Sequence, residues 1–391
     1  MIASNSSLPL AAVSGLTSAI PGVLPSTLPS SQGPVPAERI YLAPMMECTD
    51  RHFRFLVRVL SKHVRLYTEM ITAQAIVHGN RNRLLDFDVS EHSVVLQVGG
   101  SDPELLARAA VYAAEWGYDE INLNCGCPSD RVKSGRFGAC LMAEPEVVAR
   151  CVESMAKASG LRITVKTRIG IDDLDSYEHL CRFIDVVAKA GCPEFSIHAR
   201  KAWLKGLSPK ENREVPPLRY DVAADLVRDF PDLRFALNGG ITTLDQCEAH
   251  LKTFAAVMIG REAYRNPMML AEVDRRFHGA VAEPISREAA VTTMLPYVSE
   301  RIAEGERLHF ITRHLNGLWM GARGGKAFRR ALGQGAAKAG EGAEVIERAL
   351  VAGLTAAEKA DDEEEAWRAQ GVVASSAEDL SLRLSTGFQN P

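Results

Sequence analysis

The segment EINLNCGCPSDRVKSGRFGACLMAEPEVVARCVESMAKA, residues 120–158, reads as one strand, one glycine-containing loop and one helix. Polar and apolar side chains alternate in its first part, which places Asn122 and Asn124 on one face of a strand. Ile121 and Leu123 then lie on the other face. In its final part apolar residues recur at intervals of three and four, which predicts a helix. A strand followed by a covering helix is the repeating unit of α/β folds.

The same unit recurs along most of the chain. Eight strand-like runs alternate with helical patterns over about 220 to 240 residues, which is typical of a (β/α)₈ TIM barrel rather than an open sheet. After Pro267 the pattern changes, and only helical segments follow, so we expect a C-terminal all-helical domain. The strands are expected at residues 40–43, 65–69, 94–98, 120–124, 162–167, 194–198, 233–237 and 256–259.

Composition divides the chain into four parts. The first residues contain six prolines and no charged side chain, without a basic segment before an apolar run, so we expect a flexible leader rather than a targeting signal. The last residues resemble a tail. The expected parts are a leader at 1–37, a barrel at 38–280, a helical domain at 285–365 and a tail at 366–391.

Charge and cysteine content restrict the class of protein. No run of apolar residues is long enough to span a membrane, and the eight cysteines follow no regular interval, which favours reduced thiols in the cytoplasm. The net charge is −4, yet residues 313–338 contain six bases and no acid. This segment is either the footprint of a polyanion or a solvated helix face.

A barrel predicts that chemistry lies where its strands end. The residues there are mostly polar, and strand alternation turns Lys166 and His198 to the same side as Asn124. Glycine-rich turns follow the last two strands, NGGI at 238–241 and IGREAY at 259–264, which is where this fold usually binds phosphate. Two tight turns without a ligand are the alternative. The strand-end residues are Met45, Glu69, Gln97, Asn124, Lys166, His198, Asn238 and Gly260.

The closely spaced cysteines of the first segment allow three interpretations. A zinc site needs a second pair of ligands, and none follows at a suitable spacing. A disulfide between Cys125 and Cys127 is geometrically tight and is disfavoured in a reducing compartment. The third interpretation is one working thiol: Cys125 shares the face of Leu123 and packs against helices, whereas Cys127 is presented over the barrel mouth. A thiol with a pKa near ~8.5 is mostly protonated at neutral pH and is able to donate a proton.

Several longer motifs resemble a known family, the flavin-dependent tRNA-dihydrouridine synthases, and most closely their A-type branch. The motifs are LAPMMECTDRHFR, NLNCGCPSDRVKSGRFGACLM, VKTRIGID, IHARKAWLKGLSPKENREVPPL, NGGI and IGREAY. The resemblance runs from about residue 38 to residue 340. Cys125 departs from the family pattern, which usually has an aliphatic residue there, so a phenotype of a Cys125 variant is easily misread.

The resemblance implies the roles of individual residues. Cys127 matches the cysteine that donates a proton to the substrate. FMN is implied to contact Pro44, Met45, Met46, Gln97, Lys166 and His198, and to place its phosphate at Asn238, Gly239, Gly240, Gly260 and Arg261. The positions implied to meet tRNA are Asn124, Lys210, Arg213, Lys326 and Arg329.

The implied reaction is reduction of the C5–C6 double bond of a D-loop uridine, at positions 20 and 20a for the A-type branch. NADPH reduces FMN, the flavin delivers hydride to C6, and Cys127 protonates C5. The expected protein is a cytoplasmic monomer without metal or membrane, with tRNA as its partner. One alternative is an FMN-dependent barrel oxidoreductase that acts on a free pyrimidine. Another is an RNA-binding protein that has lost catalysis.

Overall fold

The computed structural model describes residues 37–129, 135–338 and 340–369, so the leader and most of the tail lie outside it. Eight parallel strands form a closed barrel, because β2 pairs with both β1 and β4. The expected (β/α)₈ barrel and all eight of its strands are confirmed. The strands are β1 (Ile40–Leu42), β2 (Val64–Tyr67), β4 (Val94–Gly99), β5 (Glu120–Cys125), β6 (Arg162–Arg168), β7 (Glu194–His198), β8 (Arg234–Asn238) and β9 (Ala256–Ile259).

One further short strand was not anticipated. β2 ends at Tyr67, and β3 (Ile71–Thr72) pairs with the end of β4. The hydroxyl of Thr68 donates to the carbonyl of Glu69 and accepts the backbone N–H of Gln97, at 2.7 and 3.0 Å. The backbone N–H of Thr68 still donates to the Val95 carbonyl of β4 at 3.0 Å, but the regular strand ends at Tyr67, so the expected strand at 65–69 is two residues too long at its end.

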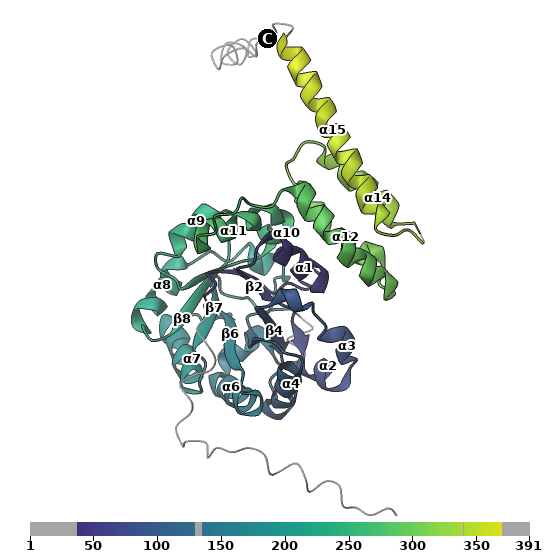
Figure 1. Ribbon diagram of the computed structural model, residues 1–391. Helices are drawn as coiled ribbons and strands as arrows, with labels where there is room; N and C mark the ends of the chain where they lie inside the picture. The colour runs from purple at the N-terminus through teal and green to yellow at the C-terminus, as the bar shows by residue number, and fades with distance from the viewer. Residues whose placement is uncertain (1–36, 130–134, 339, 370–391) are drawn as a thin grey trace, which may run out of the picture.

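Helices surround the barrel (Figure 1). Most begin at residues that accept backbone N–H groups: Asp50 caps α1, Asp102 caps α4 and Thr243 caps α9. The helices are α1 (Arg51–Leu60), α2 (Ala73–His78), α3 (Arg81–Leu84), α4 (Pro103–Glu115), α6 (Pro145–Ser159), α7 (Tyr177–Lys189), α8 (Tyr220–Asp229), α9 (Leu244–His250), α10 (Arg261–Arg265) and α11 (Val273–His278). Together with the closed sheet they hold the strand ends in fixed positions.

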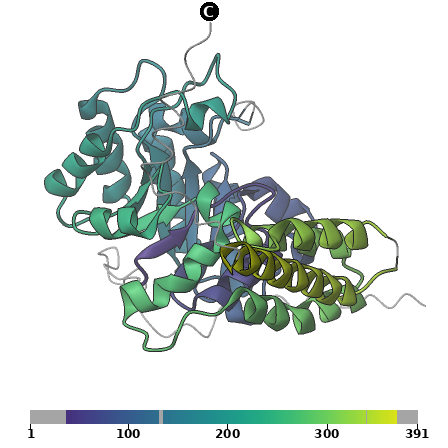
Figure 2. The same cartoon turned by 90° about the horizontal axis from the view of Figure 1, so that it is seen from above.

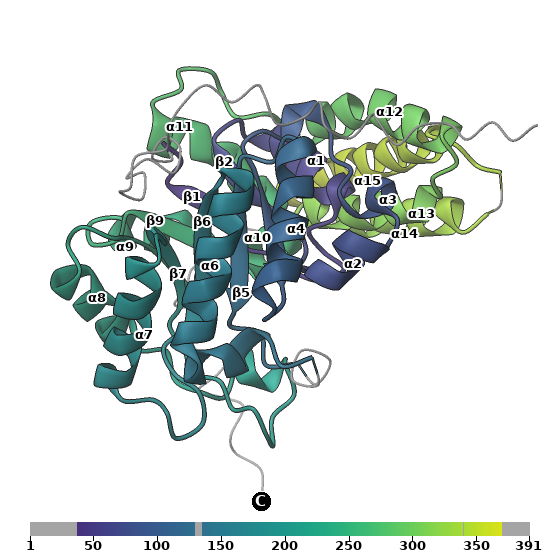
Figure 3. The same cartoon turned by 90° about the horizontal axis from the view of Figure 1, so that it is seen from below.

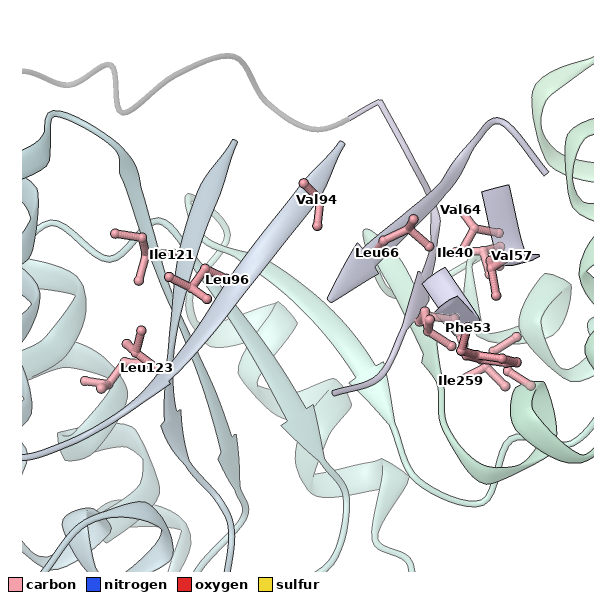
Figure 4. Close-up of a cluster of buried hydrophobic side chains, with 14 of the residues drawn as sticks. Ile40, Phe53, Val57, Val64, Leu66, Val94, Leu96, Ile121, Leu123 and Ile259 are labelled. Carbon is pink, nitrogen blue, oxygen red and sulfur yellow. The ribbon is translucent and has the colours of Figure 1, made fainter. Parts of the chain in front are cut away.

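The apolar core lies mainly between the strands and their helices. Ile40 and Ile259 of the barrel pack with Phe53 and Val57 of α1 (Figure 4), and these side chains are fully buried. Burial of one such side chain stabilises the fold by roughly 1.5–3 kcal/mol. A smaller apolar cluster fills the barrel interior; its members are Tyr41, Ala43, Tyr67, Val95, Ala236, Ala256 and Met258.

A helical domain follows the barrel, as expected, and lies beside it next to α1 (Figures 1 and 2). Its helices gather on the side away from α7 and α8 (Figure 3). The ring of Tyr297 stacks on Phe55 of α1, with centroids 3.9 Å apart. α15 continues to Ala369, beyond the expected limit at residue 365, since the segment is rich in alanine and glutamate. The elements are α12 (Arg287–Ala303), α13 (Leu308–Thr312), the 3₁₀ segment η5 (Arg313–Trp319), α14 (Gly325–Ala336) and α15 (Glu344–Ala369).

Candidate active site

The strand register gathers the predicted polar residues at one end of the barrel. Asn124 of β5 is paired with Lys166 of β6, and His198 of β7 with Asn238 of β8. Because all eight barrel strands are parallel, their carboxyl ends form one rim, which we call the mouth. The loops after β1, β8 and β9 carry the other predicted flavin residues to the same rim, except Gln97, which lies within β4.

Amide side chains form a buried network below the mouth. Gln97 Nε2 donates to Asn122 Oδ1 at 2.8 Å, and Gln97 Oε1 accepts from Asn124 Nδ2 at 2.9 Å. Asn122 also donates to the hydroxyl of Thr164 at 2.9 Å. These bonds cross from β4 to β5 and β6, so the predicted inward face of the two asparagines is confirmed. A network whose donors and acceptors are paired holds each side chain in one orientation.

Three groups fix the backbone around Cys127. Its N–H donates to Asn124 Oδ1 at 3.0 Å, and its carbonyl accepts from Ala139 N–H at 2.9 Å. The carbonyl of the preceding residue, Gly126, accepts from Arg168 Nε at 3.0 Å. The Cys127 thiol is half-buried and lies 3.5 Å from Ser129 Oγ. The thiol is therefore held at a defined place while remaining accessible from the mouth.

The neighbouring cysteine has a different environment. Cys125 is fully buried, and burial raises the pKa of its thiol well above the usual range. Its predicted packing towards the covering helices is confirmed, since it belongs to the core between sheet and helices. All eight cysteines are free thiols, so Cys125 and Cys127 form no disulfide. Within the described ranges, no group of three or more His, Cys, Asp or Glu side chains is placed to hold a metal ion.

Asn124 has a structural task that its sequence position did not indicate. Its carboxamide oxygen accepts the N–H groups of both Gly126 and Cys127, and its nitrogen donates to Gln97. These bonds engage both ends of the amide inside the protein. Its contact with RNA stays a prediction, whereas its support of the Cys127 turn is a property of the structure.

Lys166 is a cation at the mouth, near the end of β6. Its Nζ donates to Asn238 Oδ1 at 3.0 Å, and Asn238 Nδ2 donates to the carbonyl of Met258 at 2.8 Å. Burial, together with the nearby Arg168 guanidinium, lowers the pKa of Lys166 to about 7. The side chain of Asn238, expected at the phosphate, is thus occupied with orienting Lys166.

The glycines after β8 lie against His198. Gly239 has φ +114° and Gly240 has φ +71°, a region that favours glycine. A Cβ on Gly239 would lie 2.7 Å from the His198 ring, so only a residue without a side chain fits there. Burial, reinforced by nearby cations, lowers the pKa of His198 well below its usual value, so this imidazole is neutral.

The last strand supplies a second glycine turn. Gly260 precedes α10, and no side chain caps this helix. The side chain of Arg261 is half exposed and forms an ion pair with Glu214 at 2.7 Å. An anion at this turn would meet Arg261 only by sharing it with Glu214.

The donor set fits FMN. The mouth offers a cation at Lys166, a neutral imidazole at His198 and side-chain-free backbone at Gly239, whereas the amide of Gln97 is buried below it and bonded to Asn122 and Asn124. Its cations outnumber its carboxylates, which suits an anionic phosphate and a ring that gains negative charge on reduction. The predicted flavin residues Pro44, Met45 and Met46 line the rim after β1, where Met46 is 55% exposed. The assignment of each contact stays a prediction.

The predicted RNA residues occupy two separate surfaces. Lys210 and Arg213 lie on the loop between β7 and α8 and are exposed. Lys326 and Arg329 lie on α14 of the helical domain, where they line a depression of about 630 Å³ together with Trp319. The structure therefore does not unite these four residues in one patch.

Two important residues were missed by the sequence analysis. Arg168 is 3% exposed and donates to the carbonyls of Gly126, Lys201 and Asn212, at 3.0, 3.1 and 2.9 Å. It thereby ties the Cys127 turn to the β7–α8 loop. Asn212 is fully buried and donates to the carbonyl of Trp203 at 2.9 Å within that loop. Strand alternation carried a signal for Arg168, because it shares the inward face of Lys166; Asn212 had none.

Comparisons with known proteins identify the family of the chain. The dihydrouridine synthase (Dus) family model matches residues 41–353. Three similar proteins, each named tRNA-dihydrouridine(20/20a) synthase, come from Shewanella oneidensis, Synechocystis sp. and Pseudomonas putida. They are 56%, 55% and 51% identical to this chain, over 79%, 80% and 83% of its length and 92%, 93% and 97% of theirs. The chain belongs to the dihydrouridine synthase family.

Proposed function

We propose that this chain is a tRNA-dihydrouridine synthase that reduces the C5–C6 bond of uridines 20 and 20a in the tRNA D-loop. Relatives that carry this name and are more than half identical over most of both chains support the assignment. The observation that carries the proposal is the position of Cys127. Its thiol stands at the barrel mouth beside the cations Lys166 and Arg168.

FMN is the proposed cofactor, and when bound it supplies the hydride for uracil C6. We assign the ring contacts to Gln97, Lys166 and His198 and the phosphate to the turns at Gly239 and Gly260, which the shared rim of strand ends supports. Lys166 is held over the mouth by Asn238, where a cation stabilises negative charge that develops during reduction. NADPH is the proposed reductant.

Cys127 is the proposed proton donor to uracil C5. Hydride addition at C6 leaves negative charge at C5 and the C4 carbonyl, so a nearby acid must deliver a proton. The bonds from Asn124 and Ala139 keep the thiol in place for this step. A well-placed general acid accelerates such a reaction by about 10² to 10⁴.

RNA binding is the second requirement, since a stacked uridine reaches the mouth only after it is turned out, at a cost of a few kcal/mol. We assign the compensating phosphate contacts to the β7–α8 loop and to α14 of the helical domain, residues 285–365. In the basic segment, Arg313 pairs with Asp50 and Arg323 with Asp361. Lys326 is exposed and forms no ion pair with the described part of the chain, so it remains free for phosphate.

The decisive experiment supplies the purified protein with NADPH and unmodified tRNA and maps dihydrouridine by position. We expect it at positions 20 and 20a and no turnover of free uracil or uridine. Cys127→Ala should lower turnover about 10²- to 10⁴-fold while FMN stays bound. Cys125→Ala is the matched control, because it removes a buried thiol two residues away and should leave turnover unchanged.

Other outcomes separate the alternatives. Turnover of free pyrimidines without modification of tRNA would identify a small-molecule oxidoreductase. A colourless protein that binds tRNA would identify a binding protein without catalysis.

No helix among the described residues has the length and apolarity needed to cross a membrane. We place the reaction in the cytoplasm, where unmodified tRNA is available.

A further inference from the structure

One carboxylate, Asp50, bridges the barrel and the helical domain. Its Oδ1 caps α1 by accepting the N–H groups of His52 and Phe53, both at 3.0 Å. Its Oδ2 faces the helical domain, where it pairs with Arg313 and lies 2.9 Å from His314 Nε2. One side chain thus serves a barrel helix and the start of η5 simultaneously.

Asp50 also ends the loop that carries the predicted flavin residues. The preceding residue, Thr49, accepts the N–H of Met45 through its hydroxyl at 3.0 Å and donates its own N–H to the Met45 carbonyl at 3.0 Å. Buried Arg54 donates to the Thr49 carbonyl at 2.9 Å. The loop after β1 is therefore continuous with the Asp50 contact.

η5 is seated firmly on the barrel. The His314 side chain is fully buried between the rings of Phe53 and Tyr264, with centroids 5.7 Å from each. A Cβ on Gly317 would lie 2.6 Å from Pro267 Cδ and 2.8 Å from the Tyr264 carbonyl. η5 therefore contacts both the loop after β1 and the segment after β9, which are the two ends of the predicted flavin site.

The other end of η5 holds the predicted RNA helix. Trp319 stacks on Phe328 of α14 with centroids 4.1 Å apart, and its carbonyl accepts from Arg329 Nη1 at 3.1 Å. Contacts are thus continuous from Asp50 through η5 to α14. In a close-packed chain of contacts, the distance between the mouth and α14 is fixed rather than variable.

We infer that Asp50 is a positioning residue that sets the placement of α14 relative to Cys127 and so selects which uridine is reduced. The inference rests on the proposed function. Phosphate contacts to α14 fix the register of the RNA without reading bases. The separation between those contacts and the mouth then decides which nucleotide reaches the thiol.

Asp50→Ser tests this inference, because serine still caps α1 but is too short to reach Arg313 and His314. Asp102→Ser is the matched control: Asp102 caps α4 with Oδ1 2.9 and 3.0 Å from two N–H groups, and α4 lies outside the contact between the barrel and the helical domain. Both variants are studied as FMN-loaded enzymes. FMN content, flavin reduction by NADPH without RNA, kcat and KM for unmodified tRNA, and the positional map of dihydrouridine are measured.

For Asp50→Ser we expect unchanged FMN content and NADPH reduction, roughly tenfold or greater loss of kcat/KM at position 20, and dihydrouridine at other D-loop uridines. Removal of an acid makes the surface more positive, so simple electrostatics would instead tighten RNA binding without changing the map. An unchanged map, a loss of FMN, or equal losses in Asp50→Ser and Asp102→Ser would each overturn the inference.

Asp50→Asn, which retains the cap and the shape of the side chain without its charge, replaces the serine variant if that protein fails to fold. It should shift the map in the same direction, and an unshifted map would again overturn the inference. Failure of the proposed function looks different, since the unsubstituted enzyme would then modify no uridine in tRNA.

Discussion

At the amino-terminal end of the barrel, three arginines form ion pairs with three glutamates. At the mouth, by contrast, one of five cations forms an ion pair within the described chain. We call the six residues of the first group the base of the barrel. Its arginines are Arg65, Arg162 and Arg234, and its acids are Glu38, Glu120 and Glu194. The cations of the mouth are Lys166, Arg168, Arg200, Arg213 and Arg261. The same barrel therefore balances its charges at one end and leaves them in excess at the other.

At the base the charges neutralise one another. Glu120 lies 3.0 Å from Arg65 and 3.2 Å from Arg162, and its other oxygen accepts from Thr164 at 2.7 Å. Arg162 continues to Glu194 at 3.0 Å, which also accepts from Tyr41 at 2.9 Å. Buried charges with such partners support the fold and offer nothing to a ligand.

At the mouth most of the cations meet neutral acceptors instead. Among the described residues, Arg168 donates to backbone carbonyls and Lys166 to an amide. Burial, followed by repulsion from Arg213 and Arg200, lowers the pKa of Arg168 to about 10. Cations without a paired carboxylate cost stability, and they suit the proposed anionic ligands, a flavin phosphate and an RNA backbone. Charge pairing therefore distinguishes the structural end of the barrel from the proposed functional end.

Removing a carboxylate from the ion pairs at the base of the barrel should have the largest effect, a loss of stability. Glu120→Ala leaves Arg65 and Arg162 buried without this carboxylate, so we expect the free energy of unfolding to fall by about 3–5 kcal/mol. Urea unfolding measures the loss. Glu146→Ala removes an exposed pair with Arg182 and should cost at most about 1 kcal/mol. Equal losses in the two variants would contradict the structural role of the base.

Adding a side chain in the glycine turn at the mouth should lower the affinity for FMN. Gly239→Ala places a methyl group 2.7 Å from the His198 ring, so we expect FMN affinity to fall about tenfold or more. Positive φ should also cost about 1–3 kcal/mol of stability. Gly117→Ala is the control, since Gly117 has φ +83° but no atom within 4 Å of the added group. It should lose similar stability and keep FMN; a similar FMN loss would refute the expectation.

The smallest effect at neutral pH should be a dependence of FMN affinity on pH. In the cofactor-free protein the pKa of Lys166 is about 7, so the side chain loses its charge as pH rises through 7. An acceptor ligand favours the charged form, and binding then takes up a proton. FMN affinity should therefore fall above pH 7 by up to about tenfold per pH unit. Fluorescence titration at several pH values measures this.

Lys166→Arg sharpens the result, because a guanidinium stays charged throughout this range. Its FMN affinity should not change between pH 7 and 9. The same slope in both proteins would mean that another group titrates.

Much of the fold and part of the site follow from local patterns. The alternation in β5 predicted the inward asparagines, and the turn after it predicted that Cys127, not Cys125, faces the mouth. The base also had a signal: Glu120, Arg162, Glu194 and Arg234 each begin a strand, and parallel pairing makes them neighbours. The end of β2 before Thr68 had no signal in the local sequence, because it depends on a hydrogen bond between Thr68 and β4.

By itself the sequence determined the barrel, the helical domain and the chemical groups at the mouth, since period-two and helical patterns are local properties of the chain. Only the tertiary structure decided which of those groups are paired. Arg168 and Asn212 meet across 44 residues, and Asp50 and His314 across 264. Such contacts depend on the register of strands and the seating of η5, which no local pattern encodes, and they decide where charge is neutralised and where it remains for a ligand.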